Sequence, residues 1–140
     1  MKVAEMSFVF LQWRSPEEAN ESQFLTEKVD VFSMGHILFR LICGHEPWNK
    51  LEIGGKPKRE EMNEKVKAGI LPRVPDEVMN TDDEEVIAIR DAMFECYTYD
   101  PEKRPSAREI TKKLNKALLD LKYKMDVARK KKHTRGRIHV

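Results

Sequence analysis

The chain lacks the features that mark secreted and membrane proteins. Its only two cysteines, Cys43 and Cys96, stand far apart and outside any CxxC motif, so we expect reduced, buried thiols. The longest apolar run, VFSMGHILFRLIC at 31–43, is interrupted by polar residues and cannot serve as a membrane helix. The start of the chain has Glu5 inside its one apolar stretch and no small-residue cleavage site. These absences exclude a secretory signal and predict an intracellular protein, cytoplasmic or nuclear.

The sequence also offers little for a metal ion. Its histidines are His36, His45, His133 and His139, and they form no HExxH motif and no convergent spacing with carboxylates. We therefore expect no metal site in this chain and no cofactor bound by it.

Acidic residues are scarce at the end of the chain, although the totals nearly balance at 26 basic and 24 acidic residues. Residues 122–140 hold eight lysines and arginines against Asp126 alone, a net charge of +7 that leaves −5 for the rest. The first expectation is a solvated basic tail. An anionic partner for residues 122–137 is the alternative, whether an import receptor, a membrane surface or nucleic-acid phosphates. No aromatic residue follows Tyr123, so such binding would be electrostatic and salt-sensitive, without base stacking.

Hydrophobic periodicity predicts a mostly α domain with four helices and no convincing strand beyond an uncertain segment at 6–13. The first helix is expected to begin near Thr26 as N-cap and to run to Cys43, where Gly44 stops it. This helix is apolar nearly all round. Its polar members recur every three or four positions on one narrow stripe, formed by Asp30, Ser33, His36 and Arg40. Such a helix belongs at the centre of a core.

Asp30 lies in the first turn of this predicted helix. It can accept backbone N–H groups from another segment of the chain, while the helix dipole favours its negative charge. A plain capping carboxylate fits the same spacing equally well.

A loop rich in glycine, proline and charge follows, with Trp48 beside a proline as its expected apolar anchor. The next predicted helix covers about 59–68. Only Met62 and Val66 give this helix an apolar stripe, so it should lie at the surface.

Two capping boxes predict the starts of the last two helices. Thr81 with Glu84 forms a T-x-x-E box, and Ser106 with Glu109 forms a second box. The apolar face of the last helix is expected to reach Met125, after which lysines take over.

The turn between these helices, YDPEKRPSAREI, holds an arginine in a rigid frame. Asp100 can cap the turn, and Pro105 restricts the backbone of Arg104 before it. A planar guanidinium held in one direction suits a carboxylate that is also held in place. The polar bend QWRSPEE at 12–18 holds another carboxylate, Glu17, and these residues by themselves are compatible with Glu17 and Arg104 being two separate surface charges.

Taken together, three stretches resemble the C-terminal lobe of the protein kinases over about residues 10–120. RSPEE is similar to the A-P-E motif that ends the family's activation segment, with Ser15 where alanine is usual. TEKVDVFSMGHILFRLICGHEPW resembles the family's central buried helix, with Phe32 in place of a tryptophan. DPEKRPSAREI resembles the loop that presents the family's conserved arginine. We therefore divide the chain into a partial kinase domain at 1–121 and a basic tail at 122–140.

The resemblance implies roles for particular residues. Glu17 is expected to pair with Arg104, which ties the end of the activation segment to the base of the lobe. Asp30 is expected to accept hydrogen bonds from the backbone of the catalytic loop. Gln12, Trp13 and Arg14 are the expected pocket for the residue that flanks the substrate's phosphorylation site; they precede the S-P-E motif.

The parts that transfer phosphate in this family are missing from the sequence. Phosphoryl transfer needs a glycine-rich loop, a strand lysine, the H-R-D aspartate and the D-F-G aspartate that holds magnesium, and the chain has none of them. The VARK at 127–130 mimics the lysine motif, but it lies at the end of a predicted helix. We thus expect an N-lobe and catalytic loop to be absent, and the chain to be a fragment or truncated gene product without activity of its own. ATP and magnesium are expected only for a full-length parent.

For that parent, the implied activity is transfer of the ATP γ-phosphate to a protein hydroxyl, with Ser/Thr favoured over Tyr. The rival interpretation is a non-catalytic, kinase-derived interaction module with a docking surface at 59–70 and a protein partner. A weaker one, a nucleic-acid-binding helical domain, depends on the basic tail alone.

Overall fold

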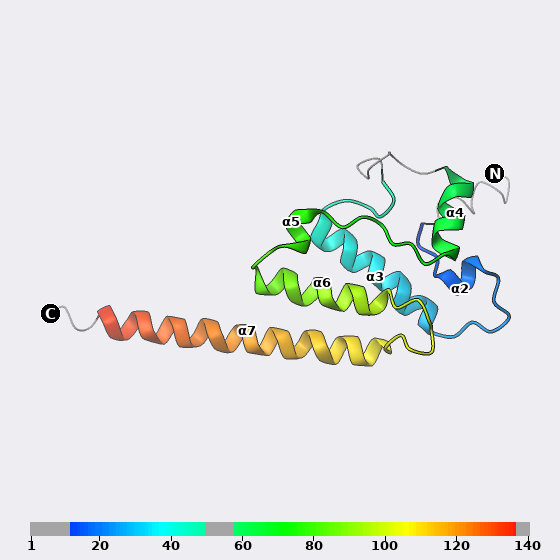
Figure 1. Cartoon of the computed structure of the whole chain (residues 1–140). Coiled ribbons are helices and arrows are strands. Elements are labelled where there is room, and N and C mark those ends of the chain that lie inside the picture. The colour runs from blue at the N-terminus through cyan, green and yellow to red at the C-terminus, as the bar shows by residue number, and fades with distance from the viewer. Residues whose placement is uncertain (1–11, 50–57, 137–140) are drawn as a thin grey trace, which may run out of the picture.

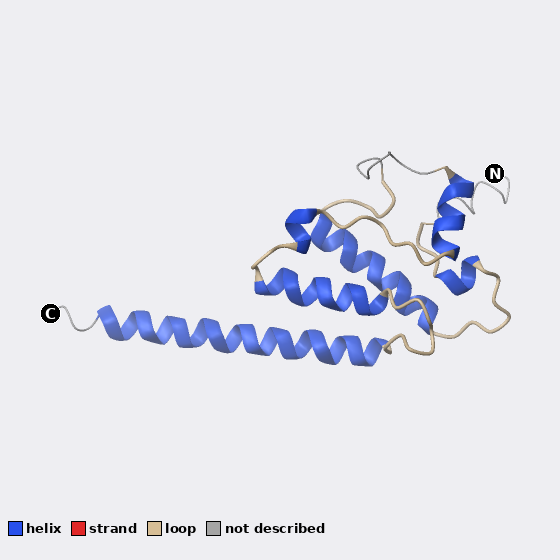
Figure 2. Cartoon of the chain, in the orientation of Figure 1, coloured by secondary structure: helices blue, strands red, loops and turns tan. Residues whose placement is uncertain are grey.

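The structure, a computed structural model, describes residues 12–49 and 58–136 (Figure 1). Its helices, in chain order, are α2 (Pro16–Ala19), α3 (Lys28–Cys43), α4 (Arg59–Lys67), α5 (Asp76–Met79), α6 (Glu84–Cys96) and α7 (Ala107–Gly136). Figure 2 shows helices and loops but no strand in these two ranges. The mostly α prediction is confirmed; the uncertain strand at 6–13 falls almost wholly outside the described residues.

Three helices form the body, because α3 packs on α6 and α6 packs on α7. Figure 1 shows α6 lying between the other two. Two buried clusters hold this layer together. One contains Val31, Ala92, Cys96 and Ile110, and the other contains Phe32, Phe39, Met93 and Tyr97. Both α3 and α6 contribute to each cluster, so the core lies mainly between these two helices. In the described body α3 therefore lies at one side, and not at the centre that its apolar sequence predicts.

The C-terminal end of α3 lies where the sequence predicts it, and the predicted N-cap is wrong. Gly44 ends the helix in the left-handed conformation, with φ 75°, as predicted. The N-cap is Glu27 rather than Thr26. The Thr26 hydroxyl accepts the N–H of Lys28 at 3.3 Å, only two residues on, so it forms a turn ahead of the helix instead of a cap.

The polar stripe of α3 is only partly exposed. Asp30 and Arg40 are exposed, but His36 is buried with only 2% of its surface accessible. The reason is tertiary, since aromatic side chains from other segments surround the imidazole. In exchange, Ile37 and Leu41 are 61% and 66% exposed, so α3 has an apolar face that the described residues leave open.

The surface helix α4 packs as its short apolar stripe predicts. Met62 and Val66 form a buried cluster with Ala19 of α2 and with Trp48, which is 2% exposed and anchors the preceding loop. Gly69, just beyond the helix, has φ 74°. The helix ends at Lys67, one residue before the predicted boundary.

The start of α6 corrects one predicted cap. Asp83, not Thr81, caps the helix, because its carboxylate accepts the N–H groups of Glu85 and Val86 at 2.9 and 3.2 Å. The Thr81 hydroxyl instead accepts the N–H of Asp83 at 3.1 Å, so the predicted Thr81–Glu84 box does not form. A carboxylate directly before the helix is the better placed acceptor.

The capping box before α7 forms as predicted. The Ser106 hydroxyl accepts the N–H of Glu109 at 3.2 Å, and the Glu109 carboxylate accepts the Ser106 N–H at 2.7 Å. The Glu109 carboxylate also accepts the Ser106 hydroxyl at 2.9 Å, and the two bonds that it accepts from the Ser106 N–H and hydroxyl lower the pKa of the Glu109 carboxyl below its usual range.

Helix α7 continues without a break across residues 121 and 122 and reaches Gly136. Lysine and arginine are good helix formers, and no proline or glycine interrupts the segment before its end. The last part of α7 extends beyond the other helices (Figure 1). Of the helices that the structure describes, none combines the length and the apolar character needed to cross a bilayer.

Both cysteines are free, as predicted. Cys96 is buried and Cys43 is half-buried, and burial raises the pKa of each thiol to about 11. Both thiols therefore stay protonated and unreactive at neutral pH.

Candidate functional site

The polar centre of the molecule is Arg104, in the loop between α6 and α7. Its side chain is fully buried, an unusual place for an arginine. Two hydrogen bonds with Asp100 fix the backbone of this loop. The Arg104 N–H donates to the Asp100 carbonyl at 2.9 Å, and the Glu102 N–H donates to the Asp100 carboxylate at 3.0 Å. The turn chemistry expected from the sequence thus fixes the direction of the guanidinium.

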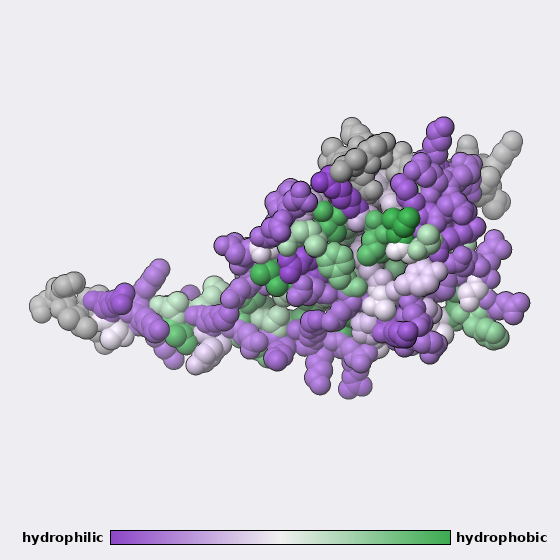
Figure 3. All heavy atoms as spheres, viewed as in Figure 1, coloured by the Kyte–Doolittle hydropathy of each residue, from purple (hydrophilic) through white to green (hydrophobic). Residues whose placement is uncertain are grey.

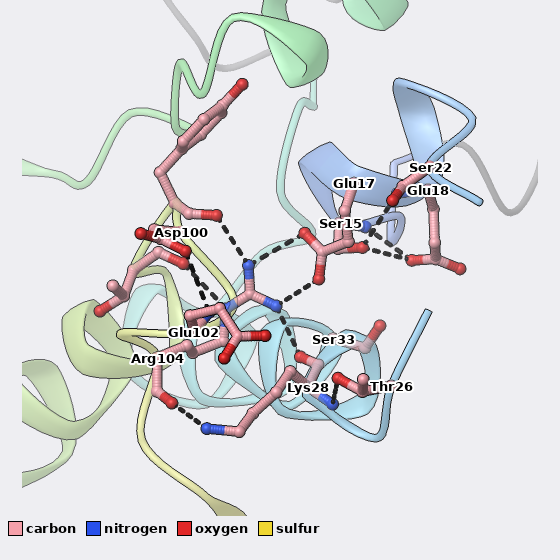
Figure 4. Close-up of polar contacts among 12 residues, drawn as sticks. Ser15, Glu17, Glu18, Ser22, Thr26, Lys28, Ser33, Asp100, Glu102 and Arg104 are labelled. Atoms are coloured by element: carbon pink, nitrogen blue, oxygen red, sulfur yellow. Dashed lines mark hydrogen bonds and ion pairs between the residues drawn. The ribbon is translucent and has the colours of Figure 1, made fainter. Parts of the chain in front are cut away.

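All five N–H donors of Arg104 have acceptors (Figure 4). Two donate to the two carboxylate oxygens of Glu17, at 2.6 and 3.0 Å, across 87 residues of sequence. The other three donate to the carbonyls of Thr98, Lys28 and Tyr99, at 2.8, 2.6 and 3.1 Å. The structure brings Glu17 and Arg104 together as a bidentate ion pair within a complete hydrogen-bond network.

Lys28 and Phe32 attach this pair to α3. Besides accepting through its carbonyl, Lys28 donates from its ammonium group to the Arg104 carbonyl. The Phe32 ring lies 4.9 Å from the centre of the guanidinium, within the range of a cation–π contact. The residue that replaces the family's tryptophan thus supports the arginine directly.

Glu17 is positioned by the short helix α2. Ser15 caps this helix, with its hydroxyl and its N–H each donating to the Glu18 carboxylate at 2.8 Å. Pro16 fills the first helical position, where its missing N–H costs nothing. The sequence signal for this capping box, S-x-x-E at 15–18, was available, and our sequence reading missed it.

The segment before α2 is anchored on α3. The Ser33 hydroxyl donates to the Trp13 carbonyl at 2.9 Å, and the Trp13 ring meets the His36 ring edge-on at 5.7 Å. Gln12, Trp13 and Arg14 are all half-buried. The backbone of this segment is thus fixed on one side, while part of each side chain remains accessible.

His36 is a buried polar residue on the polar stripe of α3. Its Nδ1 shares a 2.7 Å hydrogen bond with the Tyr97 hydroxyl, and burial lowers its pKa to about 3. The imidazole is therefore neutral at physiological pH. Phe32 and Tyr97 also contact its ring. The pattern on α3 alone could not have indicated this, because only Phe32 lies on the same helix, whereas Tyr97 follows α6 and Trp13 precedes α2.

Asp30 is not part of this network. It is exposed in the first turn of α3, and the structure does not bring it to the Glu17–Arg104 pair. Within residues 12–49 and 58–136, no three His, Cys, Asp or Glu side chains gather where they could hold a metal ion.

The geometry defines what the site can do. The Arg104 guanidinium has no free donor, and the Glu17 carboxylate is 9% exposed, so neither group can bind a substrate or accept a proton from one. The network fastens α2 and the segment before it to α3 and to the loop before α7. We call this network the clamp. It has a structural role, because it holds the backbone of residues 12–14 in place and leaves their side chains partly accessible.

Comparisons with known proteins identify the class. The family model of the protein kinase domain matches residues 2–114 of this chain. A serine/threonine-protein kinase of Saccharomyces cerevisiae is 30% identical over 99 residues, which cover 70% of this chain and 6% of that protein. A probable serine/threonine-protein kinase of Dictyostelium discoideum is 29% identical over 103 residues, which cover 74% of this chain and 6% of that protein.

Among solved structures, the twitchin kinase region of C. elegans is similar in fold. The TM-score is 0.57 at 18% sequence identity, over 74% of this chain and 17% of that one. The chain belongs to the protein kinase family. It spans only a small part of the relatives it matches, and this coverage fits the C-terminal lobe expected from its motifs.

Proposed function

We propose that the chain is the C-terminal lobe of a serine/threonine protein kinase, whose parent transfers the γ-phosphate of ATP to a protein hydroxyl. The observation that carries the proposal is the clamp between Glu17 and Arg104, which joins the S-P-E bend to the D-P-E-K-R-P loop. Two of the relatives are named as serine/threonine-protein kinases, which supports that substrate class over tyrosine.

In this proposal, residues 12–14 help to select the substrate. Gln12, Trp13 and Arg14 precede the clamp directly and are half-buried, with the Trp13 backbone held by Ser33. A pocket for a flanking residue needs fixed walls, because a mobile wall would lose conformational entropy each time a substrate bound. The clamp and the Ser33 hydrogen bond supply that fixity.

The chain by itself is proposed to have no catalytic activity. Its sequence has no glycine-rich loop, strand lysine, H-R-D or D-F-G motif, and its described residues hold no cluster suited to a metal. The parts that would bind ATP and magnesium therefore belong to other segments of the parent.

The open face of α3 supports a larger parent. Ile37 and Leu41 are exposed on α3, and Phe24 and Leu25 are exposed in the loop before it. Large apolar side chains left exposed on a helix are a signature of surface that another segment covers. In the kinase proposal, the remaining helices of the parent cover this face.

The same open face is compatible with the second candidate function, a non-catalytic interaction module. In that case another protein would cover Ile37 and Leu41, with residues 59–70 as a docking surface. One measurement separates the two candidates, because they differ in the size of the native gene product.

The test is an immunoblot of the source cells with an antibody raised against residues 126–140. A band far above 16.4 kDa supports the kinase proposal, and the immunoprecipitated protein should then phosphorylate serine or threonine peptides when ATP and Mg²⁺ are supplied. A band at 16.4 kDa would overturn it in favour of the interaction module. A large product that shows no phosphotransfer would also overturn the kinase proposal.

A further inference from the structure

The basic end of α7 is separated from the body that holds the rest of the helix. Lys113 and Lys124 form ion pairs with Glu95 and Glu84 of α6. In the described part of α7, no ion pair follows Lys124. The helix nevertheless continues to Gly136 with its cationic side chains exposed. Like charges four residues apart destabilise an isolated helix, so this segment would gain from an acidic neighbour.

An apolar groove lies between α6 and α7 and ends where the free helix begins. Its volume is about 490 Å³, and its lining includes Ala88, Ile89, Leu114, Leu118, Leu121 and Met125. Leu118 and Met125 are 49% and 66% exposed. The lining also includes two residues of opposite charge, Glu85 on α6 and Lys122 on α7.

One face of the free helix continues this groove. Met125 belongs to both, and the continuation is formed by Ala128, Arg129, Lys132 and His133. Figure 3 shows apolar patches among the polar side chains along the projecting helix. The surface therefore has two halves that meet at Met125, an apolar groove and a helix face rich in cations.

The acidic counterpart lies on the same molecule. Residues 74–89 contain six carboxylates and no lysine or arginine, namely Asp76, Glu77, Asp82, Asp83, Glu84 and Glu85. The ion pair between Glu84 and Lys124, at 2.6 Å, places this acidic run within about one helical turn of Met125. The groove thus has an acidic border at the end where the free helix leaves it.

We propose that this surface binds a second copy of the chain, with the two α7 helices antiparallel and a two-fold axis near Met125. The free helix of one copy then lies over the groove of the other, so Ala128 and the stems of Arg129 and Lys132 cover Leu118 and Leu121. The same arrangement brings these cations to the side of the groove that Glu85 of the second copy lines, with Asp82 in the turn just before α6. Because the groove and the helix face are used once by each copy, the contact closes on itself as a dimer.

Charge complementarity favours a second copy over nucleic acid. A phosphate backbone bound to the free helix would leave the acidic run of the same chain without a cationic partner. A second copy brings its own cations to that run and its own acidic run to the cations, so both charged segments are neutralised. The apolar residues Met125 and Ala128 also gain from a groove, whereas a phosphate surface offers them nothing.

Sedimentation velocity on the whole chain tests the proposal. A discrete dimer is expected at low salt (about 50 mM), with dissociation at high salt (about 500 mM), since the contact depends on screened surface charges. Aggregation through the open face of α3 would give polydisperse species that salt does not disperse, so the two kinds of association are distinguishable.

A charge exchange makes the test specific. Arg129→Glu with Lys132→Glu in one variant, and Asp82→Lys with Glu85→Lys in another, should each weaken self-association about tenfold or more. Mixing the two variants should restore the dimer, because both sets of contacts regain opposite charges in the mixed pair. The control, Lys112→Glu with Lys116→Glu, changes charge on another face of α7 and should dimerise like the unaltered chain.

Three results would overturn the proposal. The first is a monomer at every protein concentration in low salt, and the second is a mixture of the two variants that associates no better than either alone. The third is preferential binding of duplex DNA that persists in the presence of excess chain. None of these outcomes bears on phosphotransfer, so the dimer and the proposed kinase function can fail independently.

Discussion

The clamp around Arg104 and the free end of α7 use the same kind of charge in opposite ways. The Arg104 side chain is fully buried, and each of its five donors has an acceptor. Arg129 and Arg135 are exposed, and in the described structure no ion pair of α7 lies beyond Lys124. A cation at one place organises the fold, and a run of cations at the other leaves the fold untouched. The contribution of an arginine to the fold therefore depends on its burial and on its hydrogen-bond partners, and not on its charge alone.

The two regions also differ in how they are built. The clamp needs three segments at once, since Arg104 contacts Thr98 and Tyr99 of its own loop, Glu17 of α2 and Lys28 of α3. The free end of α7 needs only its own helix-forming residues. Changes in the clamp should therefore affect the whole molecule, and changes at the end of α7 should remain local.

The largest expected effect is at the centre of the clamp. Arg104→Ala leaves the Glu17 carboxylate buried without its partner, so the free energy of unfolding should fall by about 3–5 kcal/mol. Arg108→Ala, on the exposed side of α7, should change it by less than about 0.5 kcal/mol. Urea unfolding of both variants provides the measurement. Equal midpoints would mean that the clamp does not hold the fold.

Acid should lower the free energy of unfolding, because it protonates His36. In the unfolded chain the imidazole has its ordinary pKa of 6.5, and in the folded chain burial lowers the pKa to about 3. The unfolded state therefore binds the proton first, and stability that is constant above pH 6.5 falls as the pH drops toward 3. Between pH 7 and pH 5 the loss should be about 2 kcal/mol, measured by urea unfolding at each pH.

A matched pair of variants assigns this acid effect. The double variant His36→Leu with Tyr97→Phe removes the titrating group without leaving the tyrosine hydroxyl unpaired, and its stability should change far less between pH 7 and pH 5. His45→Gln should keep the full loss, because that side chain is not buried. If the double variant keeps the acid sensitivity of the unaltered chain, His36 is not its source.

A smaller effect is expected at the edge of the clamp. Ser15→Ala removes the capping hydroxyl of α2, which should cost about 1 kcal/mol in unfolding free energy. Ser22→Ala, in the exposed loop that follows, should change stability by less than about 0.5 kcal/mol. Thermal unfolding in parallel would compare the two. A cost at Ser15 as large as that at Arg104 would show that α2 has a greater part in the clamp than its length indicates.

The smallest effect belongs to the exposed ion pair of α7. Lys124→Ala breaks the contact with Glu84, but both side chains are more than half exposed and screened by solvent. Monomer stability should therefore change by less than about 0.5 kcal/mol. Urea unfolding in high salt, where the monomer is expected, gives the comparison. A loss of several kcal/mol would contradict the contrast between a closed centre and an open end.

Local sequence signals predicted the parts of the fold that depend on neighbouring residues. Gly44 ends α3, and Ser106 with Glu109 begins α7, because a turn or cap involves groups within a few positions. Thr26 and Thr81 were wrong as caps. In each case another residue stands closer to the first turn, and sequence spacing alone could not decide between them.

The candidate site was predictable only in part, and for a different reason. The pairing of Glu17 with Arg104 came from a resemblance between motifs and not from any local rule, since 87 residues separate the two. His36 could not have been found in this way. Its burial follows from the ring positions of Trp13 and Tyr97, which only the assembled structure provides.

The separation of 87 residues between the clamp partners has a consequence for the order of folding. Joining the two ends of so long a loop early would cost much chain entropy, so the contact should form only after the intervening helices have shortened the path. An interaction that is absent from the transition state affects mainly the rate of unfolding. We therefore expect the clamp to form late in folding and to act mainly on the unfolding rate, which sets the lifetime of the folded lobe.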